Sequence, residues 1–140
     1  MTNNLKKIIV TIVEKNELPV EFIKELNTIP GIELRIFEKH AADAEELLKR
    51  IAESEMIVVD LHTKYSESVL SQAKALKTIV STSFSLSHLD LEYCKQAGIQ
   101  IISFPDFQSQ NEVAEISREE LNQYFHKHLL EAIKEQASRN

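Results

Sequence analysis

The chain is poor in glycine: among its 140 residues only Gly31 and Gly98 are glycines. A dinucleotide-binding fingerprint needs three closely spaced glycines so that the backbone can approach a pyrophosphate, and a Walker loop needs glycine beside lysine. Two glycines that lie far apart in the sequence can form neither motif. We therefore expect that this chain holds no nucleotide cofactor unaided, and nothing else in the sequence indicates a cofactor.

Cysteine, long apolar runs and basic clusters are also scarce. The single cysteine, Cys94, excludes an intramolecular disulfide and favours a reducing, cytoplasmic compartment. No apolar run approaches the roughly 20 residues that a membrane-spanning helix needs. The formal net charge is -6 and no basic run exceeds two residues. This balance argues against nucleic acid and anionic membrane surfaces as partners.

What is present is a regular alternation of β-branched runs and amphipathic segments. We expect strands over 7–13, 32–37, 56–59, 78–80 and 99–102, and helices over 20–28, 43–54, 66–75 and 89–97. The run 56–59 is wholly apolar, as in a central strand, whereas 32–37 alternates as near a sheet edge. The order βαβαβαβαβ predicts an α/β fold with a parallel sheet covered by helices on both faces.

A helical tail follows this unit. Residues 111–140 contain neither glycine nor proline, and they carry an apolar stripe of Val113, Ile116, Leu121, Phe125, Leu129 and Ile133. Ser117 and Glu120 form a capping-box pattern, so one helix or two remain open. We predict an α/β domain over 1–110 and helices over 111–140 that pack on it. The part from 121 to 133 is also a candidate for dimerisation.

Polar segments are expected beyond the carboxyl ends of the strands, where open parallel sheets bind their ligands. The candidate ligand-binding residues there are Asp60, His62, Thr63, Lys64, Ser81, Ser83, Ser85 and His88. Asp60 and His62 could form an acid–base pair, and the hydroxyls of 81–87 could hold a small anion. The alternative for both segments is a set of polar turn residues.

The remaining histidines and the cysteine indicate no catalytic or metal site. His126 and His128 are two positions apart on a helix, so they face different sides, cannot share a metal and are expected at the surface. His40 is expected to stand alone in a loop. Cys94 lies within a predicted helix, with Lys95 as its one basic neighbour, and is expected to be a core thiol.

In their order and spacing, several segments resemble the substrate-binding domain of the D-2-hydroxyacid dehydrogenases, which include formate, glycerate and phosphoglycerate dehydrogenases. The matching stretches are 55–59 with 63–64 and 69–70, then 76–80, 88–92, 97–105 with its Gly-Ile strand and proline turn, and the Val-Ala-Glu of 113–115. The resemblance implies a flavodoxin-like three-layer sandwich with strand order 2-1-3-4-5.

The resemblance also implies which functional parts are missing. In that family a separate domain supplies the NAD site and the catalytic Arg, Glu and His, and these 140 residues contain no such segment. The family commonly has an arginine where this chain has Asp60, loop glycines where Ser83 and Ser85 stand, and a histidine in place of Ile116. An aspartate at the first position would repel a substrate carboxylate.

These observations predict a stand-alone, non-catalytic relative of that domain, which acts as a small-ligand-binding or protein-interaction module. The expected partners are a small anionic or hydroxy-acid ligand and a second chain, in a homodimer or a hetero-complex. The first alternative is the substrate-domain subunit of a split NAD-dependent D-2-hydroxyacid dehydrogenase. The second is a hydrolase or lyase built on Asp60, His62 and His88.

Overall fold

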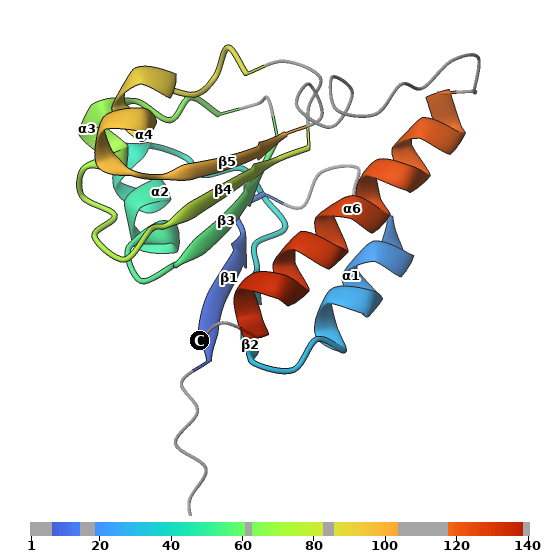
Figure 1. Ribbon diagram of the computed structural model, residues 1–140. Helices are drawn as coiled ribbons and strands as arrows, with labels where there is room; N and C mark the ends of the chain where they lie inside the picture. The colour runs from blue at the N-terminus through green and yellow to red at the C-terminus, as the bar shows by residue number, and fades with distance from the viewer. Residues whose placement is uncertain (1–6, 15–18, 61–62, 83–85, 104–117, 139–140) are drawn as a thin grey trace, which may run out of the picture.

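A computed structural model describes residues 7–14, 19–60, 63–82, 86–103 and 118–138, with side chains of the last helix described from 123 (Figure 1). Its strands are β1 (Ile8–Ile12), β2 (Ile32–Ile36), β3 (Met56–Val59), β4 (Thr78–Ser81) and β5 (Gln100–Ser103). Its helices are α1 (Val20–Asn27), α2 (Ala44–Ile51), α3 (Glu67–Leu70), α4 (Leu91–Ala97) and α6 (Arg118–Ser138).

The five strands form one parallel sheet in the order β2-β1-β3-β4-β5. This confirms the α/β fold and the strand order that the resemblance implied. All four residues of β3 are buried, as expected of a central strand, whereas most of β2 is partly exposed at the edge. The carboxyl ends of β1, β3, β4 and β5 therefore meet along one edge of the sheet.

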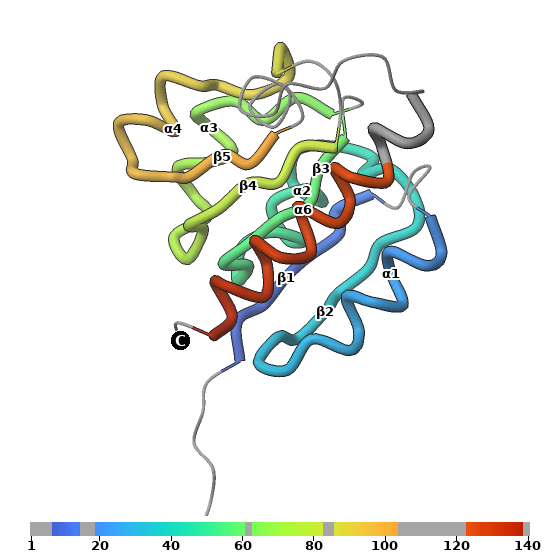
Figure 2. The backbone as a smooth tube through the Cα atoms, turned by 45° about the vertical axis from the view of Figure 1, so that its right-hand side comes forward, coloured from blue at the N-terminus to red at the C-terminus, as the bar shows by residue number. Residues whose placement is uncertain are grey.

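Helices cover both faces of the sheet (Figures 1 and 2). Helices α1 and α6 lie side by side on one face, and α2, α3 and α4 cover the other. Successive residues of β3 point to opposite faces, so Met56 and Val58 belong to the core beneath α1 and α6, and Ile57 and Val59 to the core beneath α2, α3 and α4. The central strands are thus enclosed between two apolar layers.

Helix α6 contributes directly to the first of these cores. Phe125, Leu129 and Ile133 recur every four residues on one helix face and are 1%, 0% and 0% exposed. Near its end, Gln136 accepts a hydrogen bond from Thr78 Oγ1 (2.9 Å) and donates one to Gln100 Oε1 (3.1 Å). This part of the apolar stripe packs within the chain, so these three side chains are not available to a second copy.

Helices α2, α3 and α4 are all shorter than predicted. The segment predicted as a helix over 66–75 is helical only at Glu67–Leu70, because the N–H groups of Gln72 and Ala73 bond three residues back in consecutive tight turns. Helix α4 begins at Leu91 because the Asp90 carboxylate caps it, accepting from the N–H of Tyr93 at 3.0 Å. It ends at Gly98, whose φ of 76° gives a left-handed cap.

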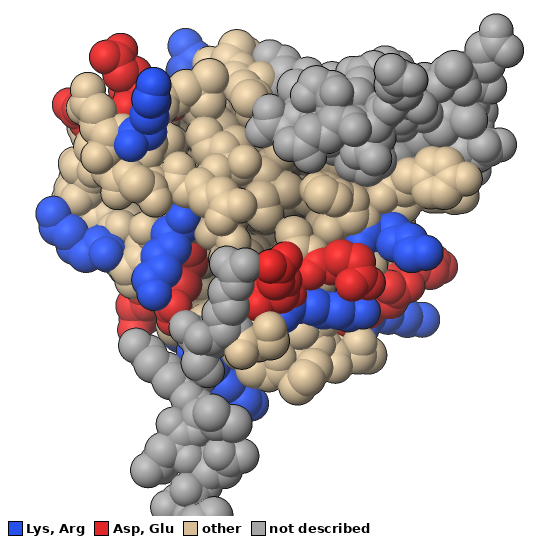
Figure 3. Space-filling model, viewed as in Figure 1, with Lys and Arg blue, Asp and Glu red and all other residues tan. Residues whose placement is uncertain are grey.

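The surface that carries α1 and α6 has acidic and basic side chains interspersed rather than gathered by sign (Figure 3). Mixed charge of this kind is typical of a helix face exposed to water.

In the described ranges, no helix combines the length and the apolar character that crossing a membrane requires.

Candidate functional site at the carboxyl edge of the sheet

A buried carboxylate, Glu14, stands just beyond the end of β1 and is 3% exposed. It accepts hydrogen bonds from Thr63 Oγ1 (2.7 Å), His40 Nδ1 (2.9 Å) and the N–H of Ala41 (3.1 Å). Burial would raise the pKa of this carboxyl, but the hydrogen bonds and the nearby His40 outweigh it and hold the pKa of Glu14 below its usual value. Glu14 is therefore a charged anchor for the loops that follow β2 and β3.

A buried cation, Arg50 of α2, lies at the same edge and is 7% exposed. Its Nη1 donates to the carbonyl oxygens of Val13 (2.8 Å) and Lys39 (2.6 Å), and its Nη2 lies 3.3 Å from a Glu46 oxygen. The guanidinium also sits over the ring of Phe37, 4.7 Å from its centroid. Arg50 thus fixes the end of β1 and the loop after β2 against α2.

Tyr65 and His88 meet in the loops that follow β3 and β4. Their rings pack edge to face, with centroids 6.4 Å apart. The N–H of Tyr65 donates to the carbonyl of His88 (2.8 Å), and the N–H of Asp90 donates to the carbonyl of Tyr65 (3.2 Å). These backbone bonds hold the two loops together as a short bridge beside the sheet edge.

Both of these rings are uncharged near neutral pH. Tyr65 is 1% exposed and His88 is 4% exposed. Burial raises the pKa of Tyr65, and it lowers the pKa of His88 although the charge of Asp60 opposes that shift. Among the residues that the structure describes, neither the Tyr65 hydroxyl nor His88 Nδ1 has a hydrogen-bond partner.

The structure places five of the eight candidate residues at this edge. They are Asp60, Thr63, Lys64, Ser81 and His88, whereas His62, Ser83 and Ser85 lie outside the described residues. Thr63 is bonded to Glu14, and Lys64 is exposed. Ser81 Oγ is 3.4 Å from His88 Nε2, a long contact for a hydrogen bond. Asp60 is close enough for its charge to act on both Tyr65 and His88.

Four residues of the site were not among the eight candidates: Glu14, His40, Arg50 and Tyr65. The expectation that His40 stands alone is wrong, because its ring is bonded to Glu14, 26 positions earlier in the sequence. Thr63 lies 49 positions after Glu14, so no local pattern could have indicated the pair. The one sequence feature that could have indicated this site is the carboxylate of Glu14, which comes directly after an otherwise apolar strand.

The other singled-out residues lie away from this edge. Cys94 is 1% exposed and burial raises the pKa of its thiol, which confirms a core position. His126 is half-buried rather than a surface residue, because α6 packs on α1 and brings the ring within 5.2 Å of the Phe22 ring centroid. Within the described ranges, no three His, Cys, Asp or Glu side chains come close enough to hold a metal ion.

The described part of the edge holds two carboxylates, a buried guanidinium and two neutral rings. Glu14 and Asp60 follow the neighbouring strands β1 and β3, so a carboxylate that approached them would meet two like charges. The Tyr65 hydroxyl and His88 Nδ1 are both buried, so they face the interior of the two loops.

We expect acidification to destabilise the fold through His88. Its folded-state pKa is lowered from 6.5, so the unfolded chain takes up the proton first, and stability is lost as the pH falls below the unfolded value. Urea unfolding from about pH 8 to about pH 5 should show this fall, and His88→Asn, which does not titrate, should make it shallower. Burial also lowers the pKa of His126, so the readout is the difference between the two proteins. An NMR titration that put the His88 pKa at or above its ordinary value would contradict the expectation.

Comparison with known proteins identifies the domain that carries this edge. A family model described as the catalytic domain of D-isomer specific 2-hydroxyacid dehydrogenases matches residues 8–140. The hydroxypyruvate reductase of Thermotoga maritima is 31% identical over 73 residues, which is 52% of this chain and 24% of the reductase. The D-3-phosphoglycerate dehydrogenase of Methanocaldococcus jannaschii is 32% identical over 65 residues, 46% of this chain and 12% of that enzyme.

A solved structure shows the same fold. The NAD+-bound 3-phosphoglycerate dehydrogenase of Entamoeba histolytica matches with a TM-score of 0.61 and 20% identity, over 70% of this chain and 33% of that one. The chain thus spans a third or less of each of these three proteins. The family match extends from β1 through α6 and covers the whole carboxyl edge described above. The chain therefore belongs to the D-isomer specific 2-hydroxyacid dehydrogenase family, whose catalytic domain it matches.

Proposed function

We propose that this chain is a non-catalytic binding module of the family, which does not transfer hydride by itself. The observation that supports this most directly is the use of its two glycines. Gly31 (φ 87°) turns the chain into β2, and Gly98 (φ 76°) ends α4, so both positive-φ positions serve the fold. Neither glycine remains for the backbone loop that approaches the pyrophosphate of a dinucleotide.

The proposed ligand is a small hydroxy acid or a similar polar molecule at the carboxyl edge. We expect its polar groups to lie among Asp60, Thr63, Lys64, Ser81 and His88, the candidates that the structure places at this edge. Its carboxylate would point away from Asp60 and Glu14, toward the exposed Lys64. The candidates His62, Ser83 and Ser85 belong to the same proposal on their sequence positions.

The purified chain is expected to show no hydride transfer. We expect no oxidation of NADH with hydroxypyruvate and no reduction of NAD+ with D-3-phosphoglycerate, because no dinucleotide is held beside the substrate edge. Isothermal titration calorimetry with NAD+ and with NADH should give no saturable binding. A full-length family enzyme assayed in the same buffer is the positive control. Retained dinucleotide after purification, or turnover by this chain alone, would overturn the proposal.

The second candidate is the substrate-domain subunit of a split dehydrogenase. It is supported by the family match, since the model that covers residues 8–140 is described as a catalytic domain. In that case the partner is a chain that carries the dinucleotide fingerprint. Mixing the two chains should restore NADH oxidation with hydroxypyruvate and raise the solution mass to that of a complex. If no such partner chain exists, we propose that the binding module associates with a second copy of itself.

A further inference from the structure

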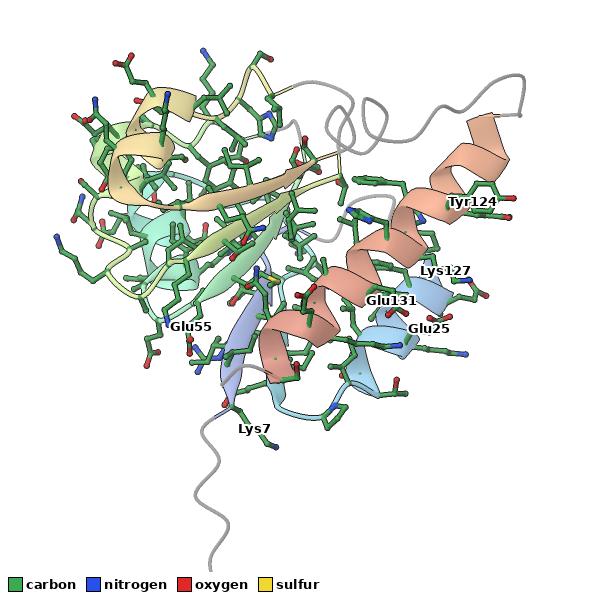
Figure 4. The ribbon with its side chains drawn as sticks, in the orientation of Figure 1. Lys7, Glu25, Glu55, Tyr124, Lys127 and Glu131 are labelled. Carbon is green, nitrogen blue, oxygen red and sulfur yellow. The ribbon has the colours of Figure 1, made fainter. Side chains whose placement is uncertain are left out.

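A second pocket lies at the opposite edge of the sheet, where the strands begin. It has a volume of about 450 Å³ and is bounded by the starts of β1, β3, β4 and β5 and by the last turns of α6. This size falls in the range of small-molecule sites. Figure 4 labels Glu55 at this edge, beside the beginning of β3. The pocket is separate from Tyr65 and His88, and the inference below does not depend on the proposed function.

A loosely paired acid and base line this pocket. The Glu55 carboxylate is 13% exposed, and its Oε2 is 3.8 Å from Nζ of Lys77, which is 70% exposed. That separation exceeds a direct charge-assisted hydrogen bond, so both groups keep hydrogen-bonding capacity. The backbone beneath the carboxylate is fixed, because the Glu55 carbonyl accepts from the N–H groups of Lys77 (2.8 Å) and Thr78 (3.1 Å).

A chain of side-chain hydrogen bonds orients the amides of the pocket. Thr78 Oγ1 donates to Gln136 Oε1 at 2.9 Å, and Gln136 Nε2 donates to Gln100 Oε1 at 3.1 Å. Since the Gln100 oxygen is the acceptor in this chain, its amide nitrogen is left as a donor beside the pocket. The lining thus offers one carboxylate, one ammonium group and an oriented amide donor.

We propose that this pocket binds a small zwitterion of the α-amino acid class. The ligand's ammonium group pairs with Glu55, and its carboxylate pairs with Lys77. A zwitterion replaces the Glu55–Lys77 pair charge for charge, so neither protein charge is left without a counter-charge. A simple anion would leave the largely buried Glu55 unpaired, and a simple cation would approach Lys77.

The test is an NMR titration of the full chain with L-serine, followed at the backbone amides of Gly98 and Gln100 and the side-chain amide of Gln136. Saturable shifts at these amides are expected. Sodium acetate and ethylamine, which carry the carboxylate or the ammonium group alone, should bind at least about tenfold more weakly. Glu55→Gln and Lys77→Gln should each weaken the binding of L-serine by about tenfold or more.

The matched controls are Glu92→Gln and Lys74→Gln, which remove exposed charges that do not line the pocket and should leave the affinity unchanged. Amide dispersion in the spectrum of each variant establishes that it is folded. The Lys77 side chain is mostly exposed, so Lys77→Gln is expected to fold as the wild type does and tests the site independently of Glu55→Gln. Absence of shifts at up to on the order of 10 mM L-serine, an equal response to acetate, or equal affinities in Glu55→Gln and Glu92→Gln would each overturn the proposal.

Discussion

Phe125→Ala is expected to lower the free energy of unfolding by about 3–5 kcal/mol. Its side chain is 1% exposed and belongs to the core that α6 forms with β1, β3 and α1. The expected loss combines the transfer of an aromatic ring and the cavity that remains. The neighbouring Tyr124 is 55% exposed, so Tyr124→Ala should change the free energy of unfolding by no more than about 0.5 kcal/mol.

Urea unfolding followed by circular dichroism measures both variants, and Tyr124→Ala is the control because it removes an aromatic ring from the same helix turn. Phe125→Leu should restore much of the loss, since it keeps an apolar side chain of similar volume. Equal stabilities of Phe125→Ala and Tyr124→Ala would show that α6 does not unfold together with the sheet. The conclusion that the apolar stripe of α6 packs within the chain would then be wrong.

Glu14→Gln is expected to cost about 1–3 kcal/mol of unfolding free energy at neutral pH. The amide keeps one acceptor oxygen, but the bonds from Thr63, His40 and Ala41 lose their charged acceptor. The matched control is Glu45→Gln, at a side chain that is 81% exposed, where the change should be near zero. Urea unfolding of the three proteins gives the comparison.

The pH dependence of this difference follows from the lowered pKa of Glu14. A carboxyl whose pKa is lower in the folded than in the unfolded chain adds stability above its unfolded value of 4.5, and that stability is lost as the pH falls through the folded pKa. The gap between the wild type and Glu14→Gln should therefore be full at neutral pH and shrink as the pH falls below the unfolded value of 4.5. A gap that stayed constant or widened on acidification would contradict a charged, hydrogen-bonded Glu14.

The positions of the strands and the character of the sheet could be predicted from the sequence because they depend on local pattern. The wholly apolar run 56–59 has no polar face to turn to water, so it had to be a central strand, and all four of its residues are buried. The glycine cap is equally local, since Gly98 ends α4, whereas the Asp90 cap was not predicted and the helix was expected to begin at 89. The strand order came from the resemblance to the family, and the structure confirms it.

Other features required the folded chain. The stripe on α6 has the same helical period whether it packs inward or dimerises, and only the position of α6 beside α1 places Phe125 and Leu129 in the core.

The features of the site also separate into those that the sequence determined and those that only the structure revealed. The sequence by itself determined that no glycine-rich dinucleotide loop exists and that polar segments follow the strands. It could not show that Glu14 meets His40 and Thr63, or that Tyr65 meets His88, because these partners are brought together by the parallel sheet. Local periodicity specifies which residues form an element and which face it buries. The contacts between the loops depend on which strands are neighbours, and that is decided only when the sheet is assembled.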